Sequence, residues 1–114
     1  MIHETLNVAK TLDDQGISAE VIDVATIKPL DIDTIINSVE KTGRCVIIQE
    51  AAKTCSVSSE IAALLAEHAL TSLFAPIKRV TGYDTIMPYF KMENTYMPSE
   101  KRILDTVKQV MEYE

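Results

Sequence analysis

The chain has 114 residues, enough for one domain with a hydrophobic core but too few for two. Its formal net charge of −6 argues against a nucleic-acid or anionic-membrane surface, which needs basic residues, and suits a basic protein partner. No stretch approaches the roughly 18 apolar residues of a membrane span, and the N-terminus lacks the pattern of a signal peptide. We therefore expect a cytoplasmic protein.

The first half of the chain alternates between helical and extended patterns. Residues 2–15 have apolar positions at helical spacing, and Gly16 stands where a helix commonly ends. Residues 19–24 are rich in β-branched side chains, which predicts a strand. Asp31 is a candidate N-cap for a second helix, which the sequence predicts to end before Gly43.

The second half continues this alternation. Residues 45–48 form an unbroken apolar run typical of a strand that is covered on both faces. A helix capped by Ser56 is expected to run to about Leu73, followed by a strand over 75–81 whose alternate apolar residues suit an edge. The stretch 82–97 is long and irregular, and a last helix follows it, capped by Ser99.

This element order predicts an α/β fold. Helices and strands that alternate along a chain form a mostly parallel sheet with right-handed crossovers and helices on both faces. The chain nevertheless opens with a helix, although a βαβ unit ordinarily starts with a strand.

The two cysteines do not suggest a metal or redox site. Cys45 and Cys55 are ten positions apart, which matches neither a zinc spacing nor a CxxC motif. Cys45 lies in the apolar run, so we expect a small buried hydrophobic side chain. Cys55 lies just before a helix, where a thiol pKa can be lowered, but no histidine is near in sequence and a structural role is favoured.

No catalytic motif is present, and the chain has too few glycines for a phosphate-binding loop. Glu50 and Glu60 have a spacing compatible with acid–base chemistry, although a solvated Glu50 and a helix-dipole interaction of Glu60 are the favoured alternatives. His68 falls on the apolar stripe of its helix, which predicts a partly buried histidine. The aromatic-rich segment 82–90 is either an interface or a loop packed on its own domain.

The run Glu-Val-Ile-Asp-Val-Ala-Thr-Ile-Lys-Pro-Leu-Asp at 20–31 resembles a segment from the C-terminal domain of transketolase-like enzymes. The resemblance is strongest to the beta subunit of the thiamine-dependent 2-oxo acid dehydrogenases. Further matches follow in the same order over the whole chain, at residues 41–44, 49–51, 60–62, 75–82, Asp84-Thr85, Pro88-Tyr89 and Pro98.

This resemblance implies a three-layer α/β/α domain with a mixed, mostly parallel sheet, in which residues 1–114 form one C-terminal domain of a longer beta subunit. The full-length α2β2 component would use thiamine diphosphate and Mg²⁺ to decarboxylate a 2-oxo acid and pass the acyl group to a lipoyl group. Pyruvate-, branched-chain- and acetoin-type enzymes all remain open. The resemblance places no catalytic, cofactor-binding or metal-binding residue in this chain, so we expect the isolated chain to be inactive.

The resemblance also assigns contact residues. By position, Gly82, Asp84, Thr85, Pro88 and Tyr89 would form a subunit interface with the alpha subunit and a second beta subunit. The C-terminal residues would lie near a docking surface for the basic subunit-binding domain of the lipoyl acyltransferase; these are Glu112, Tyr113 and Glu114. A different class of function, a free-standing acidic protein-binding module, also accounts for the charge.

Two departures from the family pattern affect the expected structure. Cys55, Ser56 and Ser58 replace glycines that are common in relatives, which puts the backbone geometry of that loop in question. The strand that relatives place before the first helix is missing from the sequence. In relatives this strand lies between those equivalent to 45–48 and 21–24. We therefore expect an open edge beside 45–48, filled by 21–24 or by another chain.

Overall fold

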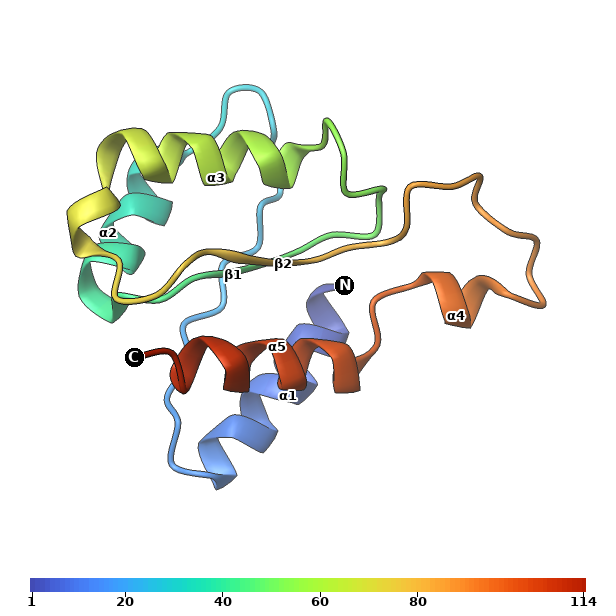
Figure 1. Ribbon diagram of the computed structural model, residues 1–114, viewed down its shortest axis with the longest axis horizontal. Coiled ribbons are helices and arrows are strands. Elements are labelled where there is room, and N and C mark those ends of the chain that lie inside the picture. The colour runs from blue at the N-terminus through green and yellow to red at the C-terminus, as the bar shows by residue number, and fades with distance from the viewer.

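A computed structural model describes all of residues 1–114. Helices and strands alternate along most of the chain, and an extended segment without secondary structure connects the first two helices (Figure 1). The elements are α1 (Ile2–Asp14), α2 (Ile32–Thr42), β1 (Val46–Ile48), α3 (Val57–His68), the 3₁₀ helix η1 (Leu70–Ser72), β2 (Lys78–Val80), α4 (Glu93–Tyr96) and α5 (Glu100–Met111).

The fold has three layers with a small parallel sheet in the middle. Strands β1 and β2 pair in parallel, with Val46 opposite Lys78 and Ile48 opposite Val80. Helices α2 and α3 lie on one face of this sheet, and α1 and α5 lie on the other (Figure 1). The α/β class, the parallel pairing and the helices on both faces are therefore confirmed.

Strand β1 contributes to the core on both sides of the sheet. Ile47 packs against the buried side chains of α2 and α3, whereas Val46 and Ile48 pack against those of α1, β2 and α5. Successive side chains of a strand point to opposite faces, so only an unbroken apolar run can serve two cores. The two clusters are Ile35, Val39, Ile61, Leu65 and Ala69, and Val8, Leu12, Val80 and Ile103.

The predicted strand over 19–24 is wrong. This segment is extended but belongs to no sheet, and its only backbone hydrogen bond joins the Ala25 N–H to the Asp23 carbonyl. The segment crosses from the layer of α1, where Ile17 packs, to the layer of α2, where Val24 packs (Figure 1). β-branched residues favour a strand only where a partner edge lies about 4.8 Å away, and none does here.

Two of the three predicted N-cap residues, Asp31 and Ser99, make the expected side-chain hydrogen bond at the start of a helix. Asp31 accepts a hydrogen bond from the Thr34 N–H at 3.1 Å, and Ser99 accepts one from the Arg102 N–H at 3.2 Å. Ser56 occupies the N-cap position of α3 without making this bond. The side chain of Gln49, at the end of β1, accepts from the Ser58 N–H at 3.0 Å in its place.

The remaining differences concern element lengths. Helix α3 ends at His68 rather than near Leu73, and β2 covers only Lys78–Val80 of the expected strand. Pro76 has no N–H to donate to a ladder, which shortens the strand on that side. The stretch expected to be irregular contains the short α4. None of the helices combines the length and the apolar character that a membrane crossing requires.

Candidate subunit-contact surface

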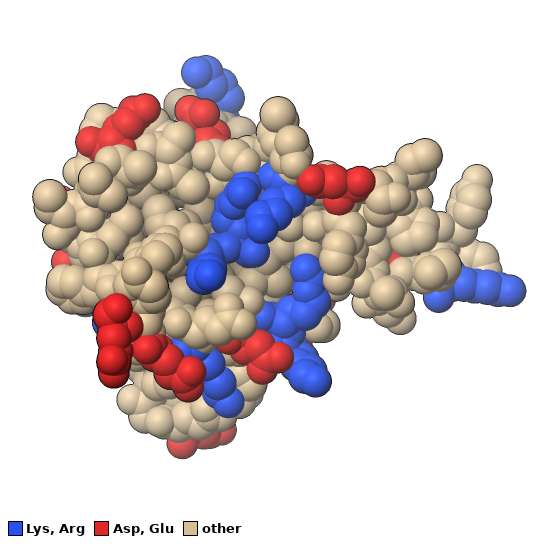
Figure 2. Space-filling view, viewed as in Figure 1, with Lys and Arg blue, Asp and Glu red and all other residues tan.

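Residues 83–92, named the arm from here on, project from the α/β body (Figure 1). Ile86, Tyr89 and Phe90 in the arm are 91%, 92% and 77% exposed, and Tyr83, Met87 and Met92 are exposed as well. Figure 2 shows that Lys and Arg gather over the middle of this face, whereas the projecting part is mostly uncharged. Exposed apolar side chains that are this large and this close together are typical of a protein–protein contact surface.

Gly82 holds the arm close to the body. A Cβ atom at this position would lie 2.5 Å from the ring of Tyr96 and 2.6 Å from the carbonyl oxygen of Glu50. The Gly82 N–H also donates to the Ala51 carbonyl at 3.0 Å. Only glycine fits this approach, because a backbone oxygen cannot rotate away as a side chain can.

Asp84 ties the first residues of the arm to the loop after β1. Its Oδ1 accepts from the N–H groups of Lys53 and Thr54 at 2.8 and 2.9 Å, and its Oδ2 accepts from the Thr54 hydroxyl at 2.5 Å. These hydrogen bonds, with the Thr54 hydroxyl first among them, hold the pKa of Asp84 below its usual value. The carboxylate form therefore stabilises the base of the arm.

Three side chains meet at the base of the arm: Tyr83 of the arm, Tyr96 of α4 and Arg102 of α5. The rings of Tyr83 and Tyr96 pack edge to face with centroids 6.2 Å apart. The guanidinium of Arg102 lies 5.0 Å from the centroid of the Tyr83 ring, and its Nη2 donates to the Thr81 carbonyl at 2.7 Å. Its Nη1 is buried without a partner.

Sequence reasoning missed Arg102 and Tyr96. A sequence feature that could have indicated Arg102 is its position in the first turn of α5. A positive charge there interacts unfavourably with the helix dipole, which suggests that the side chain makes a compensating contact.

The five residues expected at a subunit interface all lie in or beside the arm, but they differ in exposure. Gly82 is buried, Asp84 and Thr85 are exposed near the base, and Pro88 is half-buried. Tyr89 presents nearly its whole side chain to the outside. The buried and hydrogen-bonded members set the shape of the arm, and Tyr89 is available for a partner.

The residues expected at a docking surface lie elsewhere. Glu112, Tyr113 and Glu114 are exposed after the last turn of α5, at the opposite end of that helix from the arm (Figure 1). The Nε of Arg44 donates to the Val110 carbonyl at 3.1 Å and holds this end of α5 against the sheet. The chain therefore has two separate candidate contact surfaces.

Glu50, Glu60 and His68 do not form an active site. Glu50 is exposed with its Oε1 3.4 Å from the Met1 amino group, and no hydrogen bond or ion pair joins any two of the three residues. Glu60 and His68 lie in the first and last turns of α3, about 12 Å apart along its axis. No group of three or more His, Cys, Asp and Glu side chains is placed to hold a metal ion.

The expectation of a partly buried His68 is wrong. Its side chain is 54% exposed although Leu65 and Ala69 at the same end of α3 are buried, so His68 lies outside the buried face of the helix. Cys45 packs against the core cluster of α2 and α3 as expected, but it is only half-buried by its exposed surface; desolvation raises the pKa of its thiol to about 11. Cys55 is exposed and has a φ of 51°, in the left-handed region that glycine adopts readily.

Comparison with known proteins identifies the class. The family model described as "Transketolase, C-terminal domain" matches residues 1–103, so the chain belongs to the transketolase C-terminal domain family. The particular relatives are beta subunits. The chain is 45% identical to the "Pyruvate dehydrogenase E1 component subunit beta" of Bacillus subtilis (strain 168), and 47% identical to the protein of the same name from a Staphylococcus epidermidis strain.

Each of these alignments covers 99% of this chain but 35% of the relative, so the chain spans about a third of their length. Among solved structures, "Split gene transketolase, inactive beta4 tetramer" matches with a TM-score of 0.82 at 24% identity. That match covers 98% of this chain and 35% of the other, and it supports the fold. The resemblance to a 2-oxo acid dehydrogenase beta subunit is confirmed.

Proposed function

We propose that residues 1–114 are the single C-terminal assembly domain of the beta subunit of a pyruvate dehydrogenase decarboxylating component. The support for the enzyme is the 45–47% identity to beta subunits over nearly the whole chain. The support for an assembly role is the arm, whose largest side chains are exposed above a base fixed by Gly82 and Asp84. Its partners in this proposal are the alpha subunit and a second beta subunit.

The arm has the composition of an interface rather than of a solvated loop. Tyr, Phe and Met are enriched at the centres of protein–protein interfaces, and these residue types make up most of its exposed apolar surface. A rigid base lowers the entropy that the arm loses on binding. Both features favour subunit assembly over a free-standing module that recruits a basic partner through charge alone.

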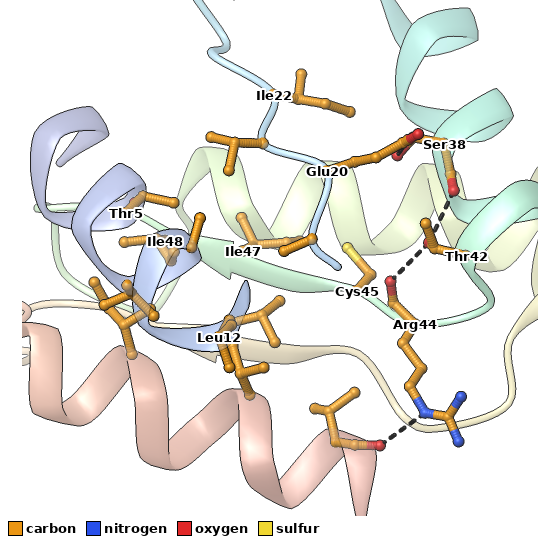
Figure 3. A pocket seen from close by; sticks show the side chains of 18 of the residues that line it. Thr5, Leu12, Glu20, Ile22, Ser38, Thr42, Arg44, Cys45, Ile47 and Ile48 are labelled. Carbon is orange, nitrogen blue, oxygen red and sulfur yellow. Dashed lines mark hydrogen bonds between the residues drawn. The ribbon is translucent and has the colours of Figure 1, made fainter. Parts of the chain in front are cut away.

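Thiamine diphosphate and Mg²⁺ belong to the full-length enzyme in this proposal. The donor set of this chain does not fit them: the structure has no cluster of carboxylates or histidines for a metal, and the cavity beside β1 is lined mainly by hydrophobic side chains (Figure 3). Mg²⁺ requires oxygen ligands in octahedral geometry, and a diphosphate requires cationic or N–H donors. We therefore place cofactor binding, decarboxylation and acyl transfer to lipoyl groups outside these residues.

A second contact is proposed at the end of α5. Glu112, Tyr113 and Glu114 combine two carboxylates with an exposed aromatic ring, and this chemistry suits the basic subunit-binding domain of the lipoyl acyltransferase. The overall charge of −6 agrees with such a partner. The choice between pyruvate and a branched-chain 2-oxo acid or acetoin depends on parts of the enzyme beyond this domain.

The arm is tested by binding of the 114-residue chain to purified alpha subunit and full-length beta subunit of a pyruvate dehydrogenase. The double variant Tyr89→Ala, Phe90→Ala should weaken binding by about tenfold or more, because interface aromatics commonly contribute over ~1 kcal/mol each. Glu67→Gln, an exposed change on α3, is the matched control. Binding that is unaffected by the arm variant, or absent with both subunits, contradicts the proposal.

The docking end and the cofactor assignment have separate tests. Binding of the acyltransferase domain should fall with Tyr113→Ala and with Glu112→Gln, and a pull-down without this dependence argues against docking there. Calorimetry of the isolated chain with thiamine diphosphate and Mg²⁺ should show no tight binding. Tight cofactor binding or 2-oxo acid decarboxylation by this chain alone contradicts its assignment as an assembly domain.

A further inference from the structure

Three cationic side chains lie on and beside the second strand of the sheet. Lys78 and Arg79 belong to β2, and Lys53 lies in the loop after β1. The Nη1 of Arg79 donates to the Lys53 carbonyl at 3.0 Å, which brings this loop against the strand. Figure 2 shows Lys and Arg gathered over the middle of the face, where Figure 1 draws β2. We name Lys53, Lys78 and Arg79 the cationic cluster.

The cationic cluster forms no ion pair within the chain. The chain has 17 acidic and 11 basic residues, yet Lys41 is the only Lys or Arg in an ion pair. Asp84 interacts with the charge of Lys53, but its oxygen atoms accept hydrogen bonds from backbone N–H groups and from the Thr54 hydroxyl. The three positive charges therefore remain available to a partner.

The guanidinium of Arg79 is fixed on one side and open on the other. Its Nη1 donates to the Lys53 carbonyl at 3.0 Å and to the Ser59 Oγ at 2.6 Å. Its Nε and Nη2 have no hydrogen-bond partner in the chain, and neither atom is buried. The N–H groups of Nε and Nη2 point in parallel, which is the geometry that binds a carboxylate through both of its oxygens. Because Nη1 already holds the side chain, binding costs little rotamer entropy.

Protection of the sheet edge does not account for the whole cluster. An exposed Lys on an edge strand keeps other chains from pairing with it, and Lys78 fits this role. That role needs charge alone, whereas Arg79 is held in one orientation by two hydrogen bonds. Nucleic acid and anionic membranes need a broad basic surface, which a chain of net charge −6 lacks. A carboxylate needs only the two parallel donors and a cation beside them.

We propose that the cationic cluster is a docking site for an acidic segment of a partner polypeptide, with one Glu or Asp carboxylate bound to Nε and Nη2 of Arg79. Further carboxylates of the segment face the ammonium groups of Lys53 and Lys78. The charge of −6 over the rest of the chain repels such a segment, so the complementary charge of the cluster confines it to this place.

The site adjoins the arm but does not depend on it. Lys53 is held through both of its backbone groups, since its N–H donates to Asp84 at the base of the arm and its carbonyl accepts from Arg79. The apolar side chains of the arm make no contact that the cationic cluster needs. Binding at the cluster can therefore be measured on the chain alone.

The test is an NMR titration of the 114-residue chain with an acetylated and amidated hexaglutamate peptide. The Nε–H signal of Arg79 is the readout, because it shifts when a carboxylate accepts from that group. We expect a saturable shift with hexaglutamate and none with hexaglutamine, the uncharged control of equal length. Raising the salt from about 0.05 M to about 0.5 M should weaken the binding, because exposed charges are screened.

Two variants locate the site. Arg79→Lys keeps the charge but removes the paired donors, and it should weaken hexaglutamate binding by about tenfold. Lys78→Gln leaves the contacts of Arg79 in place and should weaken binding by about twofold. Lys10→Gln, the same loss of charge at an exposed position of α1, is the matched control and should have no effect. Lys78→Gln keeps the comparison decisive if Arg79→Lys does not fold.

Four results overturn the proposal. They are equal binding of both peptides, binding without a shift of the Arg79 Nε–H signal, an equal loss with Lys10→Gln, and tighter binding of an oligothymidylate of the same charge. The last result identifies a phosphate ligand instead of a carboxylate. Tyr89→Ala, Phe90→Ala should leave hexaglutamate binding unchanged, so failure here is distinguishable from failure of the proposed function.

Discussion

Thr54 caps the carboxylate of Asp84 with both of its polar hydrogens, donating its N–H to Oδ1 at 2.9 Å and its hydroxyl to Oδ2 at 2.5 Å. The two residues are 30 positions apart, in the loop after β1 and in the loop after β2. Their contact joins the ends of the two parallel strands, where the arm begins. The position of the arm therefore depends on a charged group that titrates.

Protonation of Asp84 should loosen the arm. The folded-state pKa of Asp84 is lowered, so its contribution to stability is present above the unfolded pKa of about 3.9 and is lost as pH falls through the lower folded value. NMR titration of the Asp84 carboxyl should give a pKa below that of an aspartate in an unstructured peptide. Exchange of the arm amides should accelerate over the same acidic range, and Asp84→Asn should show the faster exchange already at neutral pH.

Gly82→Ala should destabilise the chain by about 1–3 kcal/mol, since the added methyl meets the Glu50 carbonyl and the Tyr96 ring. Urea unfolding measures this loss. Gly16→Ala is the control, because Gly16 has a φ of +80° but no atom within 4 Å of the point where a Cβ would stand, so only a backbone cost of about 1 kcal/mol applies. Equal losses at the two positions would show that the contacts of the added methyl with Glu50 and Tyr96 do not reduce the free energy of unfolding.

Arg102→Met should cost about 1–3 kcal/mol, because it removes a charged hydrogen bond to the Thr81 carbonyl and the cation–π contact with Tyr83. The near-isosteric Met keeps most of the aliphatic packing. Lys101→Met, one position earlier and exposed, should change the free energy of unfolding by no more than about 0.5 kcal/mol. A similar loss of stability at both positions would show that the effect comes from removing a positive charge and not from losing these two contacts of Arg102.

Cys55→Gly should stabilise the chain by about 0.5–1 kcal/mol. A φ of 51° is unfavourable for a residue with a Cβ atom, and glycine relieves this strain at some cost in unfolded-state entropy. Cys55→Ser keeps the strain and should leave the midpoint of thermal unfolding nearly unchanged. If glycine and serine behave alike, the backbone at this position is not strained.

The sequence was sufficient for elements whose signals are local. The apolar run that became β1 and the capping residues Asp31 and Ser99 all lie where their patterns predicted. The strand expected over 19–24 failed because β-propensity does not specify a partner edge. The cap supplied by Gln49 to α3 is a tertiary contact that no local pattern contains.

The candidate site shows the same division. Gly82 and Asp84 belong to a recognisable segment, and the structure shows what each does there. Arg102 lies 21 positions beyond Thr81, and only the folded chain brings its guanidinium to the Thr81 carbonyl at the base of the arm. Tyr96 likewise reaches the base of the arm only in the folded chain, where its ring packs against that of Tyr83. Their contacts could not be read from spacing, because they depend on how α5 crosses the sheet.

Helix α5 is fastened to the sheet at both of its ends. Arg102 in its first turn reaches the Thr81 carbonyl just after β2, and Arg44 just before β1 reaches the Val110 carbonyl in its last turn. These two anchor points are about 12 Å apart along the helix axis. The length of α5 therefore fixes the distance between the arm and the C-terminal residues. In the proposed function, the partners of the arm and of the C-terminal residues therefore bind at a set separation and share no contacts.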